Sequence, residues 1–404
     1  VAMAATGAVE RLQQFLRIRS VQPSPDYKTA VEWLQETYLT PLCKHEHVSS
    51  RVLELVDGKP TVLMTVEGTD ASLPSILLNS HMDVVPVEED HWEHDPWAAE
   101  EDAKGWIHGR GVQDMKSVTI QYLEAVSLML EAGERTLRTM HISIVPDEEI
   151  GGVAGMLALL DSEVFPSLNV GLALDEGLAS PTEAFTVFYG ERAPQWVNIW
   201  AEGPVGHGSR FIQGSAVEKL LAVCKKASEF RAEQEKILVD NHECGKTLGD
   251  VTSLNITVLK AGSEHAHNVV PSSALACLDI RVPPNVSYDD VVAMLNGWTA
   301  AEGVRYEFVQ KTEQNKSTAM EGAWWSTLKA SLAAQGLSLK PEIFPAATDS
   351  RFIRQRGIPA FGFSPMNNTP ILLHDHNERL HKDVFLKGVP IMRRLITDLA
   401  NVRA

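Results

Sequence analysis

The chain of 404 residues is long enough for two domains and for a large hydrophobic core in at least one of them. With 44% hydrophobic and 22% charged residues, its composition is that of a globular protein and excludes extensive disorder. Lysine and arginine number 36 against 53 acidic residues, a net charge of −17, which argues against nucleic acid or an anionic membrane as the main partner.

Cysteine usage and the N-terminal segment indicate the compartment. The four cysteines include no C-x-x-C pair of the kind that binds metal or cycles between redox states, which favours reduced thiols. The first ten residues are small and apolar, lack a basic region typical of a signal peptide, and are too short to cross a bilayer. We therefore expect a soluble, cytoplasmic protein that does not bind membranes.

The first part of the chain alternates helical and strand patterns. Helices are expected over 9–19, from residue 31, and over 116–130 with Gly133 as the stop, and strands over 62–66, 75–79, 139–145 and 170–174. Three of these strands run directly into histidine or acidic residues, at His81, at Asp147–Glu149 and at Asp175–Glu176. Strands separated by helices predict an α/β fold with a mostly parallel sheet and a site at its carboxyl edge.

A different pattern begins near Glu191. Strands over 196–200, 251–259, 274–282 and 304–309 and helices over 215–237 and 288–298 follow one another in the order β-α-β-β-α-β, which is the ferredoxin-like arrangement. The α/β pattern then resumes with a helix over 324–335, a strand over 358–363 and a final helix over 382–399. We therefore predict a discontinuous domain of residues 1–190 and 314–404, interrupted by an inserted α+β domain of residues 191–313.

The clusters after the strands contain the residue types of a metal site. They comprise His81, Asp83, Asp114, Glu148, Glu149, Asp175, Glu176, His374 and His376. Imidazoles with carboxylates and no thiolate suit borderline ions such as zinc, and a carboxylate shared by two ions is typical of two-metal hydrolases. In the simpler interpretation these acids are exposed and Asp114 only caps its helix. Of the adjacent acids Glu148 and Glu149, one could bind metal while the other accepts a proton, and the residues alone leave open which.

Seven separated motifs occur in an order that resembles the di-zinc aminoacylase and carboxypeptidase family. They are HMDVVP, GRGVQDMKS, PDEEIGG, LDEG, GHGSR, TDSRF and LLHDHNE, and they span nearly the whole chain, insertion included. The resemblance implies two zinc ions per subunit, held by His81, Asp114, Glu149, Glu176 and His374. Asp114 would bridge the ions, Glu148 would be the general base, and Asp83 would orient His81. His376 lies in the same motif as His374 and is the alternative ligand.

The resemblance also implies roles for the inserted domain, as a lid and as the contact of a homodimer. His207 would reach the neighbouring subunit's site and stabilise the oxyanion, while Asn268 and Arg281 would hold the substrate carbonyl and α-carboxylate. Thr348 and Gly362 match positions near the substrate. Without the resemblance, His207 reads as a turn histidine. A partly buried Arg281 that pairs with Asp279 or another acid is the alternative to the substrate-binding role.

The expected activity is hydrolysis of a small-molecule N-acyl-L-amino acid to a carboxylate and a free L-amino acid. A dipeptidase or carboxypeptidase with the same metal site is the nearest alternative, because both reactions cleave an amide beside a free carboxylate. The alternative outside the enzymes is a non-catalytic member of the same family that keeps the fold as a binding or scaffold module. The presence of both Glu148 and Asp83 speaks against it, since a binding module needs no general base.

Overall fold

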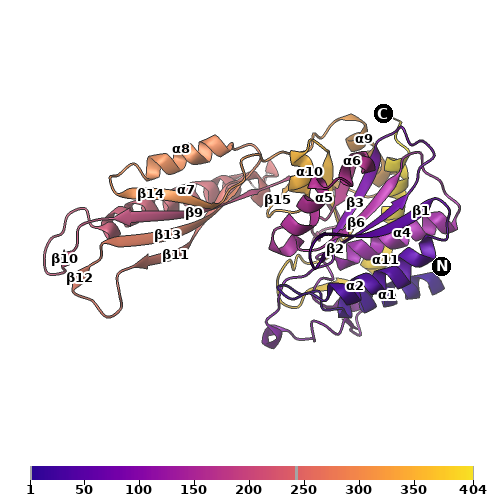
Figure 1. The fold of residues 1–404 in the computed structure, drawn as a ribbon, viewed down its shortest axis with the longest axis horizontal. Helices are drawn as coiled ribbons and strands as arrows, with labels where there is room; N and C mark the ends of the chain where they lie inside the picture. Colours follow the sequence, from indigo (N-terminus) through magenta and orange to yellow (C-terminus); the bar gives the residue numbers. More distant parts are fainter. Residues whose placement is uncertain (1, 242–243, 404) are drawn as a thin grey trace. The chain divides into compact units, whose positions relative to one another are not determined.

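A mixed sheet carries the strands on which the predicted site depends (Figure 1). The computed structural model describes residues 2–241 and 244–403, and in that part of the chain eight strands form this sheet in the order β1-β2-β6-β3-β7-β16-β8-β15. The pairings β6–β3, β3–β7 and β7–β16 are parallel, whereas β1–β2, β2–β6 and β16–β8 are antiparallel. The strands are β1 (Val48–Val56), β2 (Lys59–Val66), β3 (Ser75–His81), β6 (Met140–Val145), β7 (Val170–Asp175), β8 (Phe185–Glu191), β15 (Leu339–Phe344) and β16 (Ala360–Phe363). The predicted α/β class with a parallel sheet centre is confirmed.

Helices cover both faces of this sheet, because its central strands are apolar on both sides. Ile76 and Leu78 of β3 pack into the larger core with α1, α2, α4, α9 and α11, while Leu77 between them packs into a smaller core with α5 and α10. The helices are α1 (Ala2–Arg17), α2 (Tyr27–Leu34), α3 (Thr40–Leu42), α4 (Lys116–Glu131), α5 (Ala158–Asp161), α6 (Phe165–Leu168), α9 (Gly322–Ala334), α10 (Ser350–Gln355) and α11 (Lys382–Ala400). Helix α4 ends just before Gly133, whose φ of +69° is left-handed, as predicted for the stop.

The inserted part of the chain folds as an antiparallel sheet backed by two helices (Figure 1). Its strands pair in the order β11-β13-β9-β14, and α7 and α8 contribute apolar residues to its core. The elements are β9 (Ala193–Glu202), α7 (Ala216–Asp240), β11 (Ser253–Ala261), β13 (Ser273–Val282), α8 (Tyr288–Trp298) and β14 (Val304–Gln310), with a short ribbon of β10 (Gly206–His207) and β12 (Val269–Val270). The predicted ferredoxin-like order is confirmed.

The chain divides into two compact units, one of residues 1–189, 318–341 and 348–404 and the other of residues 190–317 and 342–347. The domain boundaries given above, at 190/191 and 313/314, stay predictions. Sequence patterns missed β1, β8 and β15, and also a three-stranded ribbon of β4 (Glu100–Glu101), β5 (Trp106–His108) and β17 (Arg379–His381). Val1, the first residue of the N-terminal segment considered above, lies outside the described residues. Within the described ranges, no helix combines the length with the apolarity needed to cross a bilayer.

Candidate metal centre

Three neighbouring strands bring the predicted residues to one edge of the large sheet. β6, β3 and β7 are adjacent and parallel, so their carboxyl ends meet at the same edge. His81 is the last residue of β3, Glu148 and Glu149 follow β6, and Glu176 follows the end of β7. Since the chain must turn where each strand stops, these side chains can leave the apolar layers and face one another.

Asp114, just before α4, lies between two imidazoles. Its Oδ1 is 3.1 Å from His81 Nε2, and its Oδ2 is 3.2 Å from His374 Nε2. The cap of α4 is Met115 rather than Asp114, so this carboxylate is not engaged in helix capping. One carboxylate with an imidazole at each oxygen is the arrangement expected of a bridging ligand.

Each imidazole also has a second carboxylate. His81 Nε2 is 3.6 Å from Glu176 Oε2, and His374 Nε2 is 2.9 Å from Glu149 Oε2. Donor atoms of His81, Glu148 and Glu176 lie within 4.8 Å of one another, as do those of His81, Asp114 and Glu149. The five predicted ligands and Glu148 therefore converge. Glu148 and Glu149 both lie within reach, so their division of roles stays a prediction.

The electrostatics of the cluster indicate missing positive charge. Burial, and next the charge of Glu176, raise the pKa of Glu148 well above its ordinary value, while burial and Asp114 raise the pKa of Glu149 to about 7. Burial and Asp114 likewise raise the pKa of Glu176. The positive charge of two imidazoles cannot balance the negative charge of the four carboxylates in this cluster, which is largely shielded from water.

The donor set fits divalent cations. Hydrogen bonds to Asp114 and Glu149 raise the pKa of His374 to about 10. Burial by itself would raise the pKa of Asp114, but hydrogen bonds from His374 and His81 outweigh it and hold this pKa below the ordinary value. Glu149 Oε1 is buried and has no hydrogen-bond partner among the described residues. Nitrogen and oxygen donors, surplus negative charge and a free lone pair are together what a borderline divalent ion requires.

The two histidines of the last motif point to different places. His374 lies in the cluster, with 50% of its side-chain surface exposed against 1% for His81. The ring of His376 instead packs against His91, with 4.9 Å between ring centroids. The geometry thus favours His374 over His376 as the member of this centre.

Asp83 makes contacts that the sequence did not suggest. The Nδ1 of His81 is 2.9 Å from the carbonyl oxygen of Asp83 and 3.5 Å from its carboxylate. That carboxylate instead accepts the backbone N–H groups of Glu148, at 3.2 Å, and Glu149, at 3.3 Å, and the side-chain amide of Gln22 at 2.8 Å. The Asp83 carboxylate therefore holds the backbone of the two acids after β6, and its role in orienting His81 stays a prediction.

Glu378 is a buried carboxylate that sequence reasoning passed over. It accepts hydrogen bonds from the Arg110 guanidinium at 2.8 Å and from the backbone N–H groups of Gly111, Gln113 and Asp114 at 2.9, 2.6 and 3.3 Å. It thereby fastens the loop that presents Asp114 to the segment that carries His374. Its place in the LLHDHNE motif is the signal that could have identified it.

Replacing Glu378 by glutamine is expected to weaken metal binding by about 10- to 100-fold, the usual effect of losing a residue that orients ligands. The amide keeps the shape of the side chain but cannot accept from all these donors at once. Metal affinity measured by competition with a chelator tests this, with the exposed Glu131→Gln as the surface control. Unchanged affinity in Glu378→Gln would remove the positioning role.

Gly362 and Thr348 lie in the first unit. A Cβ at Gly362 would come within 2.3 Å of the backbone oxygen of Glu176, so glycine is required for β16 to approach this residue so closely. Thr348 is buried, and its hydroxyl accepts the N–H of Ser350 at 3.2 Å. The neighbouring Asp349 is a further buried acid that the sequence analysis did not single out. Both of its carboxylate oxygens are buried and have no hydrogen-bond partner among the described residues. The substrate contacts predicted for Gly362 and Thr348 stay predictions.

The remaining predicted residues lie in the second unit. His207 and Asn268 are brought together on the β10–β12 ribbon, with 3.5 Å between His207 Nε2 and Asn268 Nδ2. Arg281 lies near the carboxyl end of β13, roughly 25 Å along the strand from its first residue. Its guanidinium donates two hydrogen bonds to the carboxylate of Asp279, of 2.7 and 3.0 Å. The ion pair considered for Arg281 thus exists in the structure, and its role toward a substrate stays a prediction.

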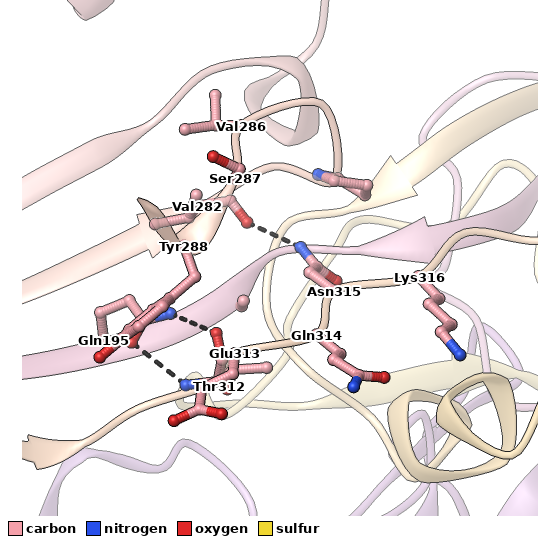
Figure 2. A pocket seen from close by; sticks show the side chains of 12 residues that line it. Gln195, Val282, Val286, Ser287, Tyr288, Thr312, Glu313, Gln314, Asn315 and Lys316 are labelled. Carbon is pink, nitrogen blue, oxygen red and sulfur yellow. Dashed lines mark hydrogen bonds between the residues drawn. The ribbon is translucent and has the colours of Figure 1, made fainter. Parts of the chain in front are cut away.

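The second unit also contains a cavity of about 320 Å³ (Figure 2). Its polar side chains are largely used internally: the amide of Gln195 donates to the carbonyl of Thr312 and accepts its N–H, and Asn315 donates to the carbonyl of Val282. The cavity is lined by none of the predicted catalytic, ligand or substrate residues. The predicted site residues therefore all lie outside this cavity.

A mixed α/β sheet with a buried histidine–carboxylate cluster at the carboxyl edge of its parallel strands, and an α+β insertion, defines a hydrolase of the metal-dependent class. Residues 77–398 match the model of peptidase family M20/M25/M40, and the chain belongs to this family.

The chain is also similar to proteins named aminoacylase-1. It is 49% identical to the one from Dictyostelium discoideum, covering 96% of this chain and 97% of that protein, and 46% identical to the human one, with 98% and 96% covered. Among solved structures, an M20 family metallo-carboxypeptidase from Sulfolobus solfataricus matches with a TM-score of 0.73 at 17% identity, covering 97% of this chain and 99% of that one. A dinuclear metal binding peptidase from Bacillus subtilis matches with a TM-score of 0.68 at 16% identity, with 98% of both chains covered.

Proposed function

We propose that the protein hydrolyses N-acyl-L-amino acids to a carboxylate and a free L-amino acid. The observation that carries the reaction type is the carboxylate of Asp114 between His81 and His374, with Glu176 and Glu149 beside them. The substrate class is supported by the full-length similarity to proteins named aminoacylase-1. A dipeptidase or carboxypeptidase activity is less favoured, because the matches to solved peptidases have far lower identity.

We propose that two zinc ions bind at this centre, where His81, Asp114, Glu149, Glu176 and His374 would hold them and Asp114 would be the shared ligand. Such ions, when bound, polarise an amide carbonyl and lower the pKa of water. Glu148 then takes the proton from the attacking water and delivers it to the leaving nitrogen. Asp83 holds the backbone N–H of Glu148, which keeps this side chain at the cluster.

In the same proposal the inserted domain closes over the substrate and forms a homodimer in the cytoplasm. His207 of a second copy stabilises the developing oxyanion, and Asn268 donates to the same region of the substrate. Arg281 binds the α-carboxylate through its planar guanidinium group. To do so it must either contact the substrate and Asp279 together or break its ion pair with Asp279. Thr348 and Gly362 lie near the substrate.

A substrate panel on one preparation of known metal content tests this function. We expect N-acetylmethionine and related N-acyl amino acids to be turned over with a higher kcat/KM than dipeptides, in proportion to bound zinc. Preference for dipeptides by a factor of about ten or more, equivalent to 1.4 kcal/mol, would favour the peptidase alternative. Carefully prepared protein that neither binds metal nor hydrolyses either class would favour the non-catalytic alternative.

A further inference from the structure

A second group of metal-type side chains lies outside the centre described above. Donor atoms of Glu88, His91 and His376 are within 4.8 Å of one another. His91 Nδ1 is 2.8 Å from Glu88 Oε2, and the rings of His91 and His376 meet nearly at right angles, at 71°, with 4.9 Å between centroids. The proposed function uses none of these three residues.

An ordinary surface ion pair explains Glu88 and His91, which are three residues apart and exposed, but it does not explain His376. The Nδ1 atom of His376 is buried and has no hydrogen-bond partner among the described residues. A buried nitrogen without a partner is costly, and a bound cation relieves that cost. Three side chains from two segments far apart in the sequence thus converge, and one of them has a ring nitrogen without a hydrogen-bond partner among the described residues.

We propose that Glu88, His91 and His376 form a solvent-accessible binding site for a borderline divalent cation such as Zn²⁺. Two imidazoles and one carboxylate suit zinc, nickel, cobalt or copper, whereas calcium and magnesium prefer oxygen ligands alone. Three protein donors leave at least one position of a tetrahedral ion to water. The two exposed donors, Glu88 and His91, make this site weaker and more exchangeable than the buried centre.

The peripheral site, Glu88–His91–His376, joins two segments of the chain, and one of them carries His374. Glu88 and His91 belong to the long loop after β3, and His376 lies two residues beyond His374. The N–H of Glu93 already donates to Asn377 Oδ1 at 2.7 Å, so the two segments are in contact. A cation at the peripheral site would fasten them a second time and restrain the segment that carries His374.

Zinc titration of the holoprotein tests the proposal without reference to activity or substrate. With the buried centre already filled, we expect wild type to bind one further Zn²⁺ per chain and to show a rise in Tm that follows this binding. His91→Ala should lose this equivalent or bind it at least about tenfold more weakly. Asp90→Asn, a neighbouring exposed acid outside the cluster, is the matched control and should behave as wild type.

Cobalt absorption supplies an independent readout. Added Co²⁺ should give a ligand-field band in wild type that is lost in His91→Ala and also in Glu88→Gln, which removes the carboxylate donor. The proposal is overturned if wild type and His91→Ala bind the same number of ions with the same affinity, or if the further equivalent persists in both variants. Either result leaves the buried centre and the proposed hydrolysis untouched, because no proposed ligand or base is altered.

Discussion

Glu148→Gln is expected to keep its full metal content and to lose about 10²- to 10⁴-fold in kcat, the contribution typical of a general base. Glutamine has nearly the same shape but cannot accept a proton from water or return it to the leaving amine. Its neighbour Glu149, with Oε2 2.9 Å from His374, is proposed to bind metal instead. Metal analysis and steady-state kinetics on the same protein separate the two roles.

Glu149→Gln is the matched comparison for this experiment. It makes the same chemical change one residue away, and there we expect bound metal to fall together with activity. If Glu148→Gln retained substantial turnover, or if it were the variant that lost metal, the assignment of base and ligand would have to be exchanged or abandoned.

Asp114→Asn is expected to have the second large effect, a loss of bound metal and of kcat/KM by more than about a thousandfold, or ~4 kcal/mol of transition-state stabilisation. In the structure each oxygen of Asp114 faces a different histidine, at 3.1 and 3.2 Å. An amide offers one oxygen and one NH₂ group, so it can serve only one of the two sides. Metal content, kcat/KM and Tm should be measured together.

The control for this variant is Asp398→Asn, which removes the ion-pair partner of the exposed Arg394 on α11 and should change none of the three quantities by much. Asp114→Asn protein with normal metal content and normal activity would contradict the bridging role. A large fall in Tm without metal loss would show instead that Asp114 is mainly structural.

The sequence predicted those parts of the fold that local pattern controls. The apolar runs at 75–79, 139–145 and 170–174 became β3, β6 and β7, and the histidine or acidic residues after them marked where each strand ends. Its β-α-β-β-α-β order likewise identified the inserted sheet. The strands β1, β8 and β15 were missed. β1 and β15 form the two edges of the sheet and β8 lies beside β15, and such outer strands take their stability from pairing partners rather than from a strong pattern of their own.

For the site, the sequence determined the kinds of donors and their places just after strands, since a side chain's chemistry and its position relative to a turn are local properties. Tertiary structure decided how they are shared. It showed that Asp114 faces both His81 and His374, that the carboxylate of Asp83 holds the backbone of Glu148 and Glu149, and that Glu378 fastens the Asp114 loop. It also placed His376 against His91 rather than in the centre. These contacts join residues up to 285 positions apart, and such pairs are set by sheet order and loop packing, which no local pattern encodes.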